Sequence, residues 1–134
     1  MDMLKLERLR NGINYGILYL GNFSLLRLIS PRPNYAEVRV TEGCNSRCVT
    51  CNAWKNSRAG ELSTEEMIYA IKQLREIGVK RIRLSGGEPL IRLDIGRLVK
   101  ECHSLGFEEI YLATNGLLLE QYAEELVQLS LIHI

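Results

Sequence analysis

The sequence predicts an α/β fold in which parallel strands alternate with helices. Three short stretches with the alternating pattern of a strand are each followed by an amphipathic helical pattern. Successive strand–helix units form parallel sheets with right-handed crossovers, so the helices lie on one side. The chain has 134 residues, 46% of them hydrophobic, which suffices for one globular core. We therefore expect half of a barrel or part of an open sheet.

The segment 1–35 is predicted to be helical and to end in a linker. Its apolar run "GILYLGNFSLLRLI" (16–29) is short for a bilayer and contains Arg27, which favours a helix covering one end of the domain. A helix on a membrane surface is the alternative. Pro31 and Pro33 disfavour helix and predict an extended linker. No secretory signal layout and no membrane span are recognisable.

The first strand–helix unit combines "AEVRVTE" (36–42) with "STEEMIYAIKQLREIG" (63–78). Ser63 and Glu66 have the spacing of a capping box, which predicts where the helix begins. Gly78 is suited to end it. The apolar stripe expected to face the sheet consists of Met67, Ile68, Ile71, Leu74 and Ile77.

The second unit combines "VKRIRLS" (79–85) with "LDIGRLVKECHSLG" (93–106), for which Asp94 is the predicted N-cap. The third combines "EEIYLAT" (108–114) with a helix that starts at 117 and continues to 128. The inward-facing positions of the second helix are expected to be Ile95, Leu98, Val99, Cys102 and Leu105.

One face of the predicted strands is apolar and the other is polar. A parallel strand buried on both faces normally reads apolar throughout, so polar residues away from the helices indicate a cavity that holds something polar. The alternative is a face open to water. The polar positions are Glu37, Arg39, Thr41, Arg81, Arg83, Ser85 and Tyr111.

Three of the four cysteines, Cys44, Cys48 and Cys51, follow the first strand with the spacing C-x3-C-x2-C. Thiolates at such spacing hold zinc or an iron–sulfur cluster. Zinc needs a fourth ligand, for which only Cys102 and His103 are available, and Cys102 lies on an apolar helix stripe. A cluster on three thiolates instead leaves one iron free to bind another molecule. Clustered thiols without a secretory signal indicate a reducing, cytoplasmic location.

Two more motifs lie at strand ends. "LSGGEPLIR" contains Gly86 and Gly87, where a ligand could approach the backbone closely, and Glu88, which could accept hydrogen bonds from an ammonium group. "ATNG" contains Thr114 and Asn115. The carboxyl ends of parallel strands share one edge, where ligand sites of α/β folds lie. A net charge of +1 gives no indication of nucleic acid as a partner.

Together, C-x3-C-x2-C, GGEP and TNG resemble the radical S-adenosylmethionine (radical SAM) superfamily, over residues 36–128. The resemblance implies a partial TIM-like (β/α) barrel with about three units present. It implies a [4Fe–4S] cluster on Cys44, Cys48 and Cys51, whose free iron binds the methionine moiety of SAM. Reductive cleavage of SAM then gives a 5′-deoxyadenosyl radical, which takes hydrogen from a substrate.

The same resemblance implies the SAM contacts. The segment 86–88 is expected to hold the methionine amino group, the backbone of Thr50 to lie near the adenine, and Thr114 with Asn115 to lie near SAM. Many members have an aromatic residue just before the third cysteine, and this chain has Thr50. Trp54 could cover the cluster instead, or simply pack in the loop.

Within the superfamily, "GVKRIRLSGGEPLIRLDI" and "ATNGLLL" look like the MoaA group, GTP cyclases of molybdenum cofactor synthesis, which also resemble PqqE and SPASM-type enzymes. That group has arginine, arginine and threonine at substrate positions where this chain has Glu37, Arg83 and Ala113. We therefore expect another small-molecule or peptide substrate, contacted by Glu37, Arg39 and Arg83. The alternatives are a GTP cyclase and a non-catalytic iron–sulfur or zinc module.

We therefore divide the chain into three segments: 1–35, 36–128 as the amino-terminal part of a radical SAM core, and 129–134. The last six residues, "LSLIHI", match the translation of a sequencing adapter, so we expect them not to be native and the chain as given to have weak or no turnover. The resemblance also implies an electron donor such as flavodoxin or ferredoxin.

Overall fold

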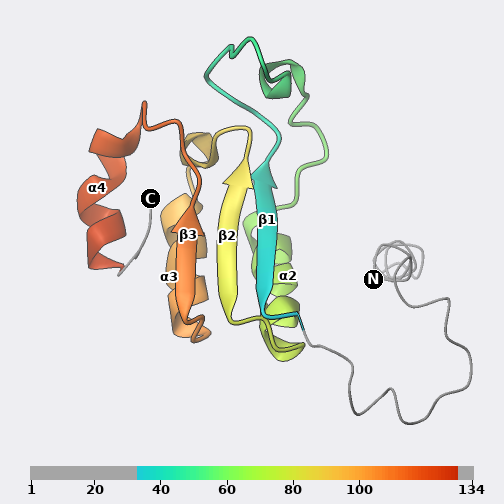
Figure 1. Cartoon of the computed structure of the whole chain (residues 1–134), viewed down its shortest axis with the longest axis vertical. Coiled ribbons are helices and arrows are strands. Elements are labelled where there is room, and N and C mark those ends of the chain that lie inside the picture. Colours follow the sequence, from blue (N-terminus) through green and yellow to red (C-terminus); the bar gives the residue numbers. More distant parts are fainter. Residues whose placement is uncertain (1–32, 130–134) are drawn as a thin grey trace, which may run out of the picture. The chain divides into compact units, whose positions relative to one another are not determined.

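The computed structural model describes residues 33–129, which all lie in one compact unit (Figure 1). The predicted helical segment therefore lies outside the described residues except for its last three positions, and the predicted non-native tail except for Leu129. The elements are β1 (Tyr35–Thr41), a short 3-10 helix (Ala53–Lys55), α2 (Thr64–Glu76), β2 (Arg81–Gly86), a second 3-10 helix (Pro89–Ile91), α3 (Ile95–Ser104), β3 (Glu109–Leu112) and α4 (Leu119–Gln128).

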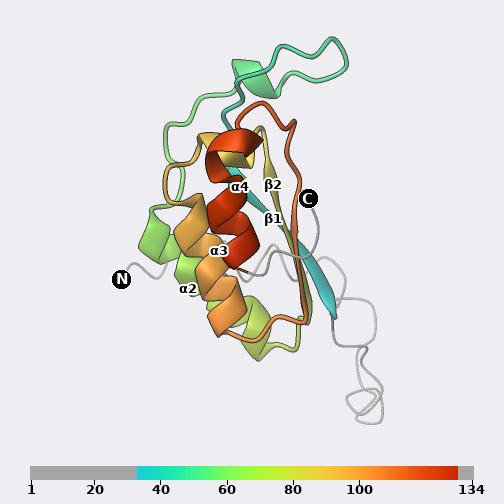
Figure 2. The ribbon, with the colours of Figure 1, turned by 90° about the vertical axis from the view of Figure 1, so that its left-hand side faces the viewer.

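The three strands form one sheet in the order β1-β2-β3, and both pairs are parallel. Figure 2 shows that the helices of residues 33–129 all lie on one side of the sheet. The sequence prediction of parallel β/α units with helices on one side is thereby confirmed. All three strands end at one edge, and the loop that follows β1 extends beyond it (Figure 1).

The core lies between the sheet and the helices. Ile82, Leu84, Ile110 and Leu112 face it from the strands and are buried. From α3 the predicted inward residues are buried as well, apart from the partly buried Leu105. Since apolar area removed from water contributes about 25 cal/mol per Å², this layer is the main source of stability.

Helix α2 begins as predicted, because Ser63 and Glu66 form a capping box with hydrogen bonds in both directions. Met67, Ile68 and Ile71 are buried against the sheet. The prediction for Ile77 was wrong, because this side chain is 50% exposed. The helix ends at Glu76, so Ile77 lies in the C-cap and no longer follows the helical stripe.

Asp94 is the N-cap residue of α3, as predicted, but its side chain makes no capping hydrogen bond. Its carboxylate instead accepts hydrogen bonds from Nε and Nη2 of Arg92 at 2.8 and 3.0 Å, and from the Thr64 hydroxyl at 2.5 Å. Burial raises the pKa of Asp94, but the hydrogen bonds from Arg92 and Thr64 outweigh it and leave this pKa below its ordinary value. Arg92 is only 5% exposed and also donates to the Val40 carbonyl, so the pair joins α2 and α3 to β1.

None of the helices within residues 33–129 has the length and apolar character that crossing a lipid bilayer requires.

Candidate functional site

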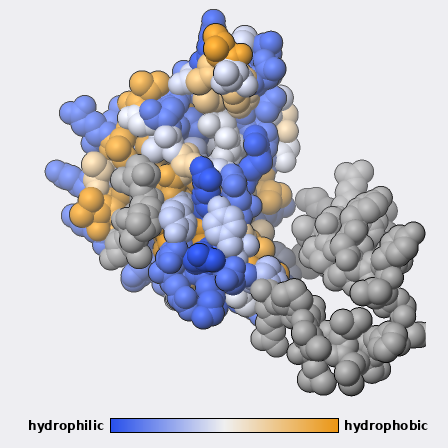
Figure 3. Space-filling view, in the orientation of Figure 1, coloured by the Kyte–Doolittle hydropathy of each residue, from blue (hydrophilic) through white to orange (hydrophobic). Residues whose placement is uncertain are grey.

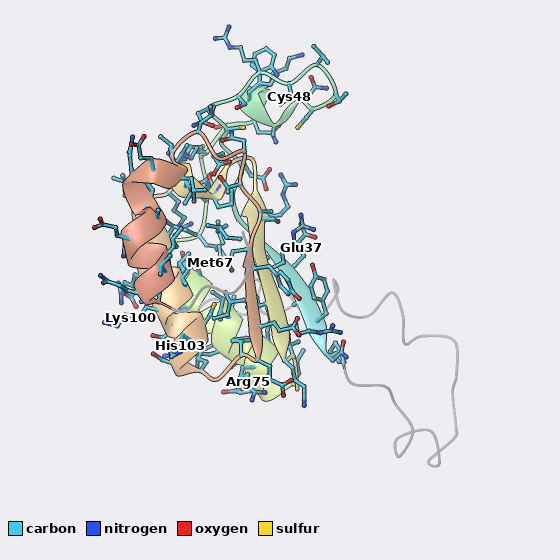
Figure 4. The ribbon with its side chains drawn as sticks, turned by 60° about the vertical axis from the view of Figure 1, so that its left-hand side comes forward. Glu37, Cys48, Met67, Arg75, Lys100 and His103 are labelled. Atoms are coloured by element: carbon cyan, nitrogen blue, oxygen red, sulfur yellow. The ribbon has the colours of Figure 1, made fainter. Side chains whose placement is uncertain are left out.

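The cysteine motif lies in the loop between β1 and α2, beyond the edge where the strands end. Figure 4 shows Cys48 in this loop, above the sheet. Cys48 and Cys51 are exposed, Cys44 is half-buried, and all three are free thiols. The sulfur atoms of Cys44 and Cys51 accept backbone N–H groups, from Ser46 and Ala53, both at 3.4 Å.

The base of this loop is held by two carboxylates. Glu61 accepts the Thr41 hydroxyl at 2.7 Å and the backbone N–H of Glu42 at 2.8 Å. Arg39 makes a two-point ion pair with Glu42, at 3.0 and 2.9 Å. This pair raises the pKa of Arg39 above its ordinary value against the effect of burial, and Cys51 and Glu37 are close enough to add to the rise.

The two glycines of GGEP lie against the start of the cysteine loop. Gly87 N–H donates to the Thr41 carbonyl at 3.0 Å, and Glu88 N–H donates to the Gly43 carbonyl at 2.9 Å. A Cβ on Gly87 would lie 2.0 Å from the Gly43 oxygen. At Gly86, where φ is +148°, a Cβ would lie 2.3 Å from the Thr41 oxygen. The close approach expected for a ligand is therefore made by the chain's own backbone, directly before Cys44.

Glu88 points into the protein and is 1% exposed. Its carboxylate accepts the Leu90 N–H at 2.9 Å, the Thr114 hydroxyl at 2.7 Å and the Asn115 N–H at 2.7 Å. Glu88 thus joins the turn after β2 to the turn after β3. Its expected contact with an ammonium group stays a prediction, and the contacts present in the structure are those of a positioning residue.

Asn115 continues this network into the cysteine loop. Its side-chain amide donates to Oδ1 of Asn45 and to Oγ of Ser46, both at 2.8 Å. Its backbone is held by Glu88, and Thr114 also accepts the Gly116 N–H. The three motifs that the sequence placed at one edge are therefore connected by hydrogen bonds. Asn45 and Ser46 carried no signal of their own in the sequence.

The sheet face away from the helices forms an open hollow of about 1010 Å³. Figure 3 shows hydrophilic side chains over the strands on this face, and Figure 4 shows Glu37 on it, opposite Met67 on the helix side. Arg39 does not line the hollow and is paired with Glu42. The polar lining comes from Tyr35, Glu37, Arg81, Arg83, Ser85 and Tyr111, together with the turns of GGEP and TNG.

The charged groups of the hollow are arranged in rows across the strands. Glu37 is the register partner of Arg83, and Arg83 is the register partner of Tyr111. Tyr111 donates its hydroxyl to Glu109. Within residues 33–129 Glu37 makes no ion pair, and Arg39 pairs with Glu42.

Ser85, the last residue before the glycines, also lines this hollow. Its side chain is on the same strand face as Arg83 by the alternation of β2. The residue is 6% exposed, and its hydroxyl is the one buried side-chain polar atom among the described residues without a hydrogen-bond partner.

Cys102 and His103 do not complete a zinc site. Cys102 is fully buried in the core on α3, where burial raises the pKa of its thiol to about 12. His103 is exposed on the same helix (Figure 4). Across residues 33–129, no three His, Cys, Asp or Glu side chains are arranged around a single metal ion.

Comparison with known proteins decides the family. The Radical SAM superfamily matches residues 38–134. The chain belongs to the radical SAM superfamily. It is 40% identical over 95 residues to a probable GTP 3′,8-cyclase of Archaeoglobus fulgidus, covering 70% of this chain and 31% of that protein. It is 42% identical over 100 residues to a GTP 3′,8-cyclase of Peptoclostridium acidaminophilum, covering 71% and 31%. The chain thus matches less than a third of the length of these relatives.

Radical SAM proteins use a [4Fe–4S] cluster and SAM, and the described residues fit both. Each thiolate of such a cluster binds a different iron, so three cysteines that do not surround one ion are compatible with it. The donor set is three free thiols on one loop, two of them with backbone N–H partners. Beside it, backbone groups of the GGEP and TNG turns line the hollow.

Around the cluster loop of this radical SAM chain, Thr50 is exposed and Trp54 is 38% exposed. The Trp54 ring is flanked by two cations, Arg47 at 5.4 Å and Lys55 at 5.0 Å from its centroid. Its contacts are thus with its own loop, as in the simpler of the two expectations.

Proposed function

We propose that this chain carries the cluster-binding and SAM-binding residues of a radical SAM enzyme. The observation that supports this most is the hydrogen-bond network that joins the cysteine loop, Glu88 and Asn115 at one sheet edge. When bound, the cluster supplies one electron that cleaves SAM to methionine and a 5′-deoxyadenosyl radical, which takes a hydrogen atom from substrate.

Each group of the chain has a distinct part in this proposal. Cys44, Cys48 and Cys51 hold iron, and the N–H groups donated to two of these sulfurs orient them. Glu88 positions the turn after β3 rather than touching solvent, because it is buried and already accepts three hydrogen bonds. Gly86, Gly87 and Thr114 border the hollow on the side where SAM is proposed to lie.

The hollow is the proposed place of a small-molecule or peptide substrate, since it adjoins the same turns. The exposed cysteine loop leaves the cluster accessible to a one-electron donor such as flavodoxin or ferredoxin. Nucleic acid is not a proposed partner, because the chain has a net charge of only +1. Free thiols fit a reducing, cytoplasmic location.

The test is anaerobic assembly of the cluster on the 134-residue chain, followed by iron and sulfide analysis and electron paramagnetic resonance. We expect a [4Fe–4S] signal that changes when SAM is added. Cys44→Ser, Cys48→Ser or Cys51→Ser should each abolish it, whereas the control Cys102→Ala should keep it, since that thiol is in the core. Zinc in place of iron, or a signal indifferent to SAM, would contradict the proposal and favour a non-catalytic module.

A second candidate is GTP 3′,8-cyclase activity, favoured by the names of relatives about 40% identical to the chain. Arg83 in the hollow fits a phosphate. Glu37 in register beside it opposes one, because a carboxylate repels a triphosphate. Conversion of GTP by the reduced, cluster-loaded protein, measured by chromatography of the product, would establish this candidate.

A further inference from the structure

The open sheet face contains a pair of opposite charges that are neighbours but are not bonded to each other. Glu37 and Arg83 are register partners on β1 and β2, strands that lie about 5 Å apart. Both side chains are exposed and line the hollow. Neither makes an ion pair or side-chain hydrogen bond within residues 33–129. A cation and an anion therefore face the same space, both available to a ligand.

A buried polar group lies two residues from Arg83. The hydroxyl of Ser85 has no hydrogen-bond partner, although the residue is 6% exposed and borders the hollow. Leaving a buried hydroxyl unpaired costs about 1–3 kcal/mol. The other buried polar side chains named above, Glu88 and Arg92, are fully engaged. Ser85 thus contributes an unused hydroxyl at the border of the hollow.

The charges select among ligand classes. The charged residues that line the hollow are Glu37, Arg81 and Arg83, one carboxylate and two guanidinium groups. Two arginines alone would suit a polyphosphate, but the Glu37 carboxylate, on β1 beside Arg83, repels a polyphosphate. A guanidinium binds a carboxylate through two parallel hydrogen bonds, and a carboxylate accepts N–H groups of an ammonium.

We infer that the open face of the sheet binds an amino acid or short peptide, with Arg83 on its carboxylate, Glu37 on its ammonium group and Ser85 as a further hydrogen-bond partner. This names the substrate class of the proposed radical enzyme and so rests on that function. Glu37 and Arg83 are then specificity residues, and Ser85, directly before Gly86, lies at the end of the hollow nearest the GGEP turn.

The experiment is a titration of the isotope-labelled 134-residue chain, followed by NMR shifts of its backbone amides. The probes are L-alanyl-L-alanine, its N-acetylated form without the ammonium, its C-terminal amide without the carboxylate, and tripolyphosphate. We expect the zwitterionic dipeptide to shift amides of β1 and β2 and to bind about tenfold more tightly than either blocked form. L-Alanine separates a single amino acid from a peptide.

Variants of the two charged residues test which group of the dipeptide each residue binds. Glu37→Gln should reduce dipeptide affinity to that of the acetylated form, and Arg83→Gln to that of the amide. Glu37→Arg should reverse the preference in favour of tripolyphosphate. The matched controls are Glu65→Gln and Arg97→Gln, an exposed ion pair between α2 and α3 on the helix side. They should leave every affinity unchanged.

Ser85→Ala separates a ligand contact from a structural role. Loss of an unpaired buried hydroxyl should not destabilise the fold, so we expect unchanged or higher stability together with several-fold weaker dipeptide binding. The control is Ser104→Ala at the exposed end of α3. Unchanged dipeptide affinity in Ser85→Ala would remove Ser85 from the site.

The inference is overturned if no amide shifts at millimolar dipeptide, if blocked and free dipeptides bind equally, or if tripolyphosphate is preferred by the unaltered chain. Cluster assembly and its response to SAM are measured on the same proteins. A chain that assembles the cluster and responds to SAM but ignores the dipeptide refutes this inference alone. A chain that binds no cluster refutes the proposed function instead.

Discussion

Charged side chains at the strand-end edge and on the open sheet face differ in burial and in hydrogen bonding. At the edge, Glu88 and Arg92 are 1% and 5% exposed, and every part of their charge is engaged by backbone or side-chain partners. On the open face, Glu37 and Arg83 are exposed and make no ion pair with described residues.

The difference distinguishes charged residues that stabilise the structure of the site from charged residues that are available to bind a ligand. A buried, fully bonded charge is expensive to leave alone, so replacing its partner should lower stability. An exposed, unpaired charge contributes little to stability, so replacing it should alter binding only. The following substitutions test this division, from the largest expected loss of stability to the smallest.

Gly87→Ala should be the most damaging change. The new Cβ would lie 2.0 Å from the Gly43 oxygen, so the turn after β2 and the start of the cysteine loop must separate. We expect a loss of about 3 kcal/mol or more in the free energy of unfolding, measured by urea denaturation, with loss of cluster assembly. The control is Gly106→Ala, where φ is +75° but the space is empty and about 1 kcal/mol is expected. Equal losses of unfolding free energy in the two variants would show that contact with the Gly43 oxygen is not the reason for glycine at position 87.

Glu88→Ala should cost about 2–3 kcal/mol, because it leaves the buried Leu90 N–H and the two part-buried donors of Thr114 and Asn115 without their acceptor. Glu88→Gln retains one acceptor oxygen and should cost about half as much. The exposed carboxylate variant Glu124→Ala is the control. Calorimetric melting measures the stabilities, and a Glu88→Ala protein as stable as this control would show that the network is not structural.

Asp94→Asn should cost about 2 kcal/mol at neutral pH, because buried Arg92 loses its carboxylate partner. The folded-state pKa of Asp94 is lower than its ordinary value of 3.8, so its contribution is complete above pH 3.8 and is lost as the pH falls through the lower folded-state pKa. The stability difference between the unaltered chain and Asp94→Asn should therefore vanish in strong acid. A difference independent of pH would contradict the assignment.

Glu37→Gln and Arg83→Gln should change the unfolding free energy by no more than about 0.5 kcal/mol each. Both side chains lie on the open face without ion-pair partners in the described part of the chain. Urea denaturation of both variants beside the unaltered chain provides the measurement. A loss comparable to that of Asp94→Asn would mean that the two charges stabilise the fold. It would refute the distinction between stabilising charges at the edge and binding charges on the open face.

The sequence predicted the fold well because its signals are local. The capping box at Ser63, the period-2 strands and the stripe of α3 each depend on residues a few positions apart, and the structure has all of them. The differences lie at helix ends, where Ile77 leaves the stripe and the N-cap residue Asp94 turns its carboxylate to Arg92 and Thr64 instead of to the helix N–H groups. There, a contact with another element outweighs the local preference.

The sequence predicted that the three motifs lie at one edge of the sheet, but it did not predict the contacts between them. Parallel topology alone brings Cys44, Gly87 and Asn115 to one edge, so the motifs could be placed together from the sequence. Three features of the site depend on contacts between segments that are far apart in the sequence. Glu88 points inward to the turn after β3, Asn115 reaches Asn45, and the glycines lie against the chain's own backbone. Neither the periodicity of the sequence nor the spacing of its motifs predicts such long-range contacts.

The contact between Asn115 and Asn45 also has a consequence for the order of folding. It joins positions 70 residues apart, and contacts of such separation form late because a long stretch of chain must first be closed. The cysteines leave the ribosome well before β3 does. We therefore expect their thiols to stay open to iron-delivery proteins until β3 docks, so that metal loading and completion of the sheet are linked in time.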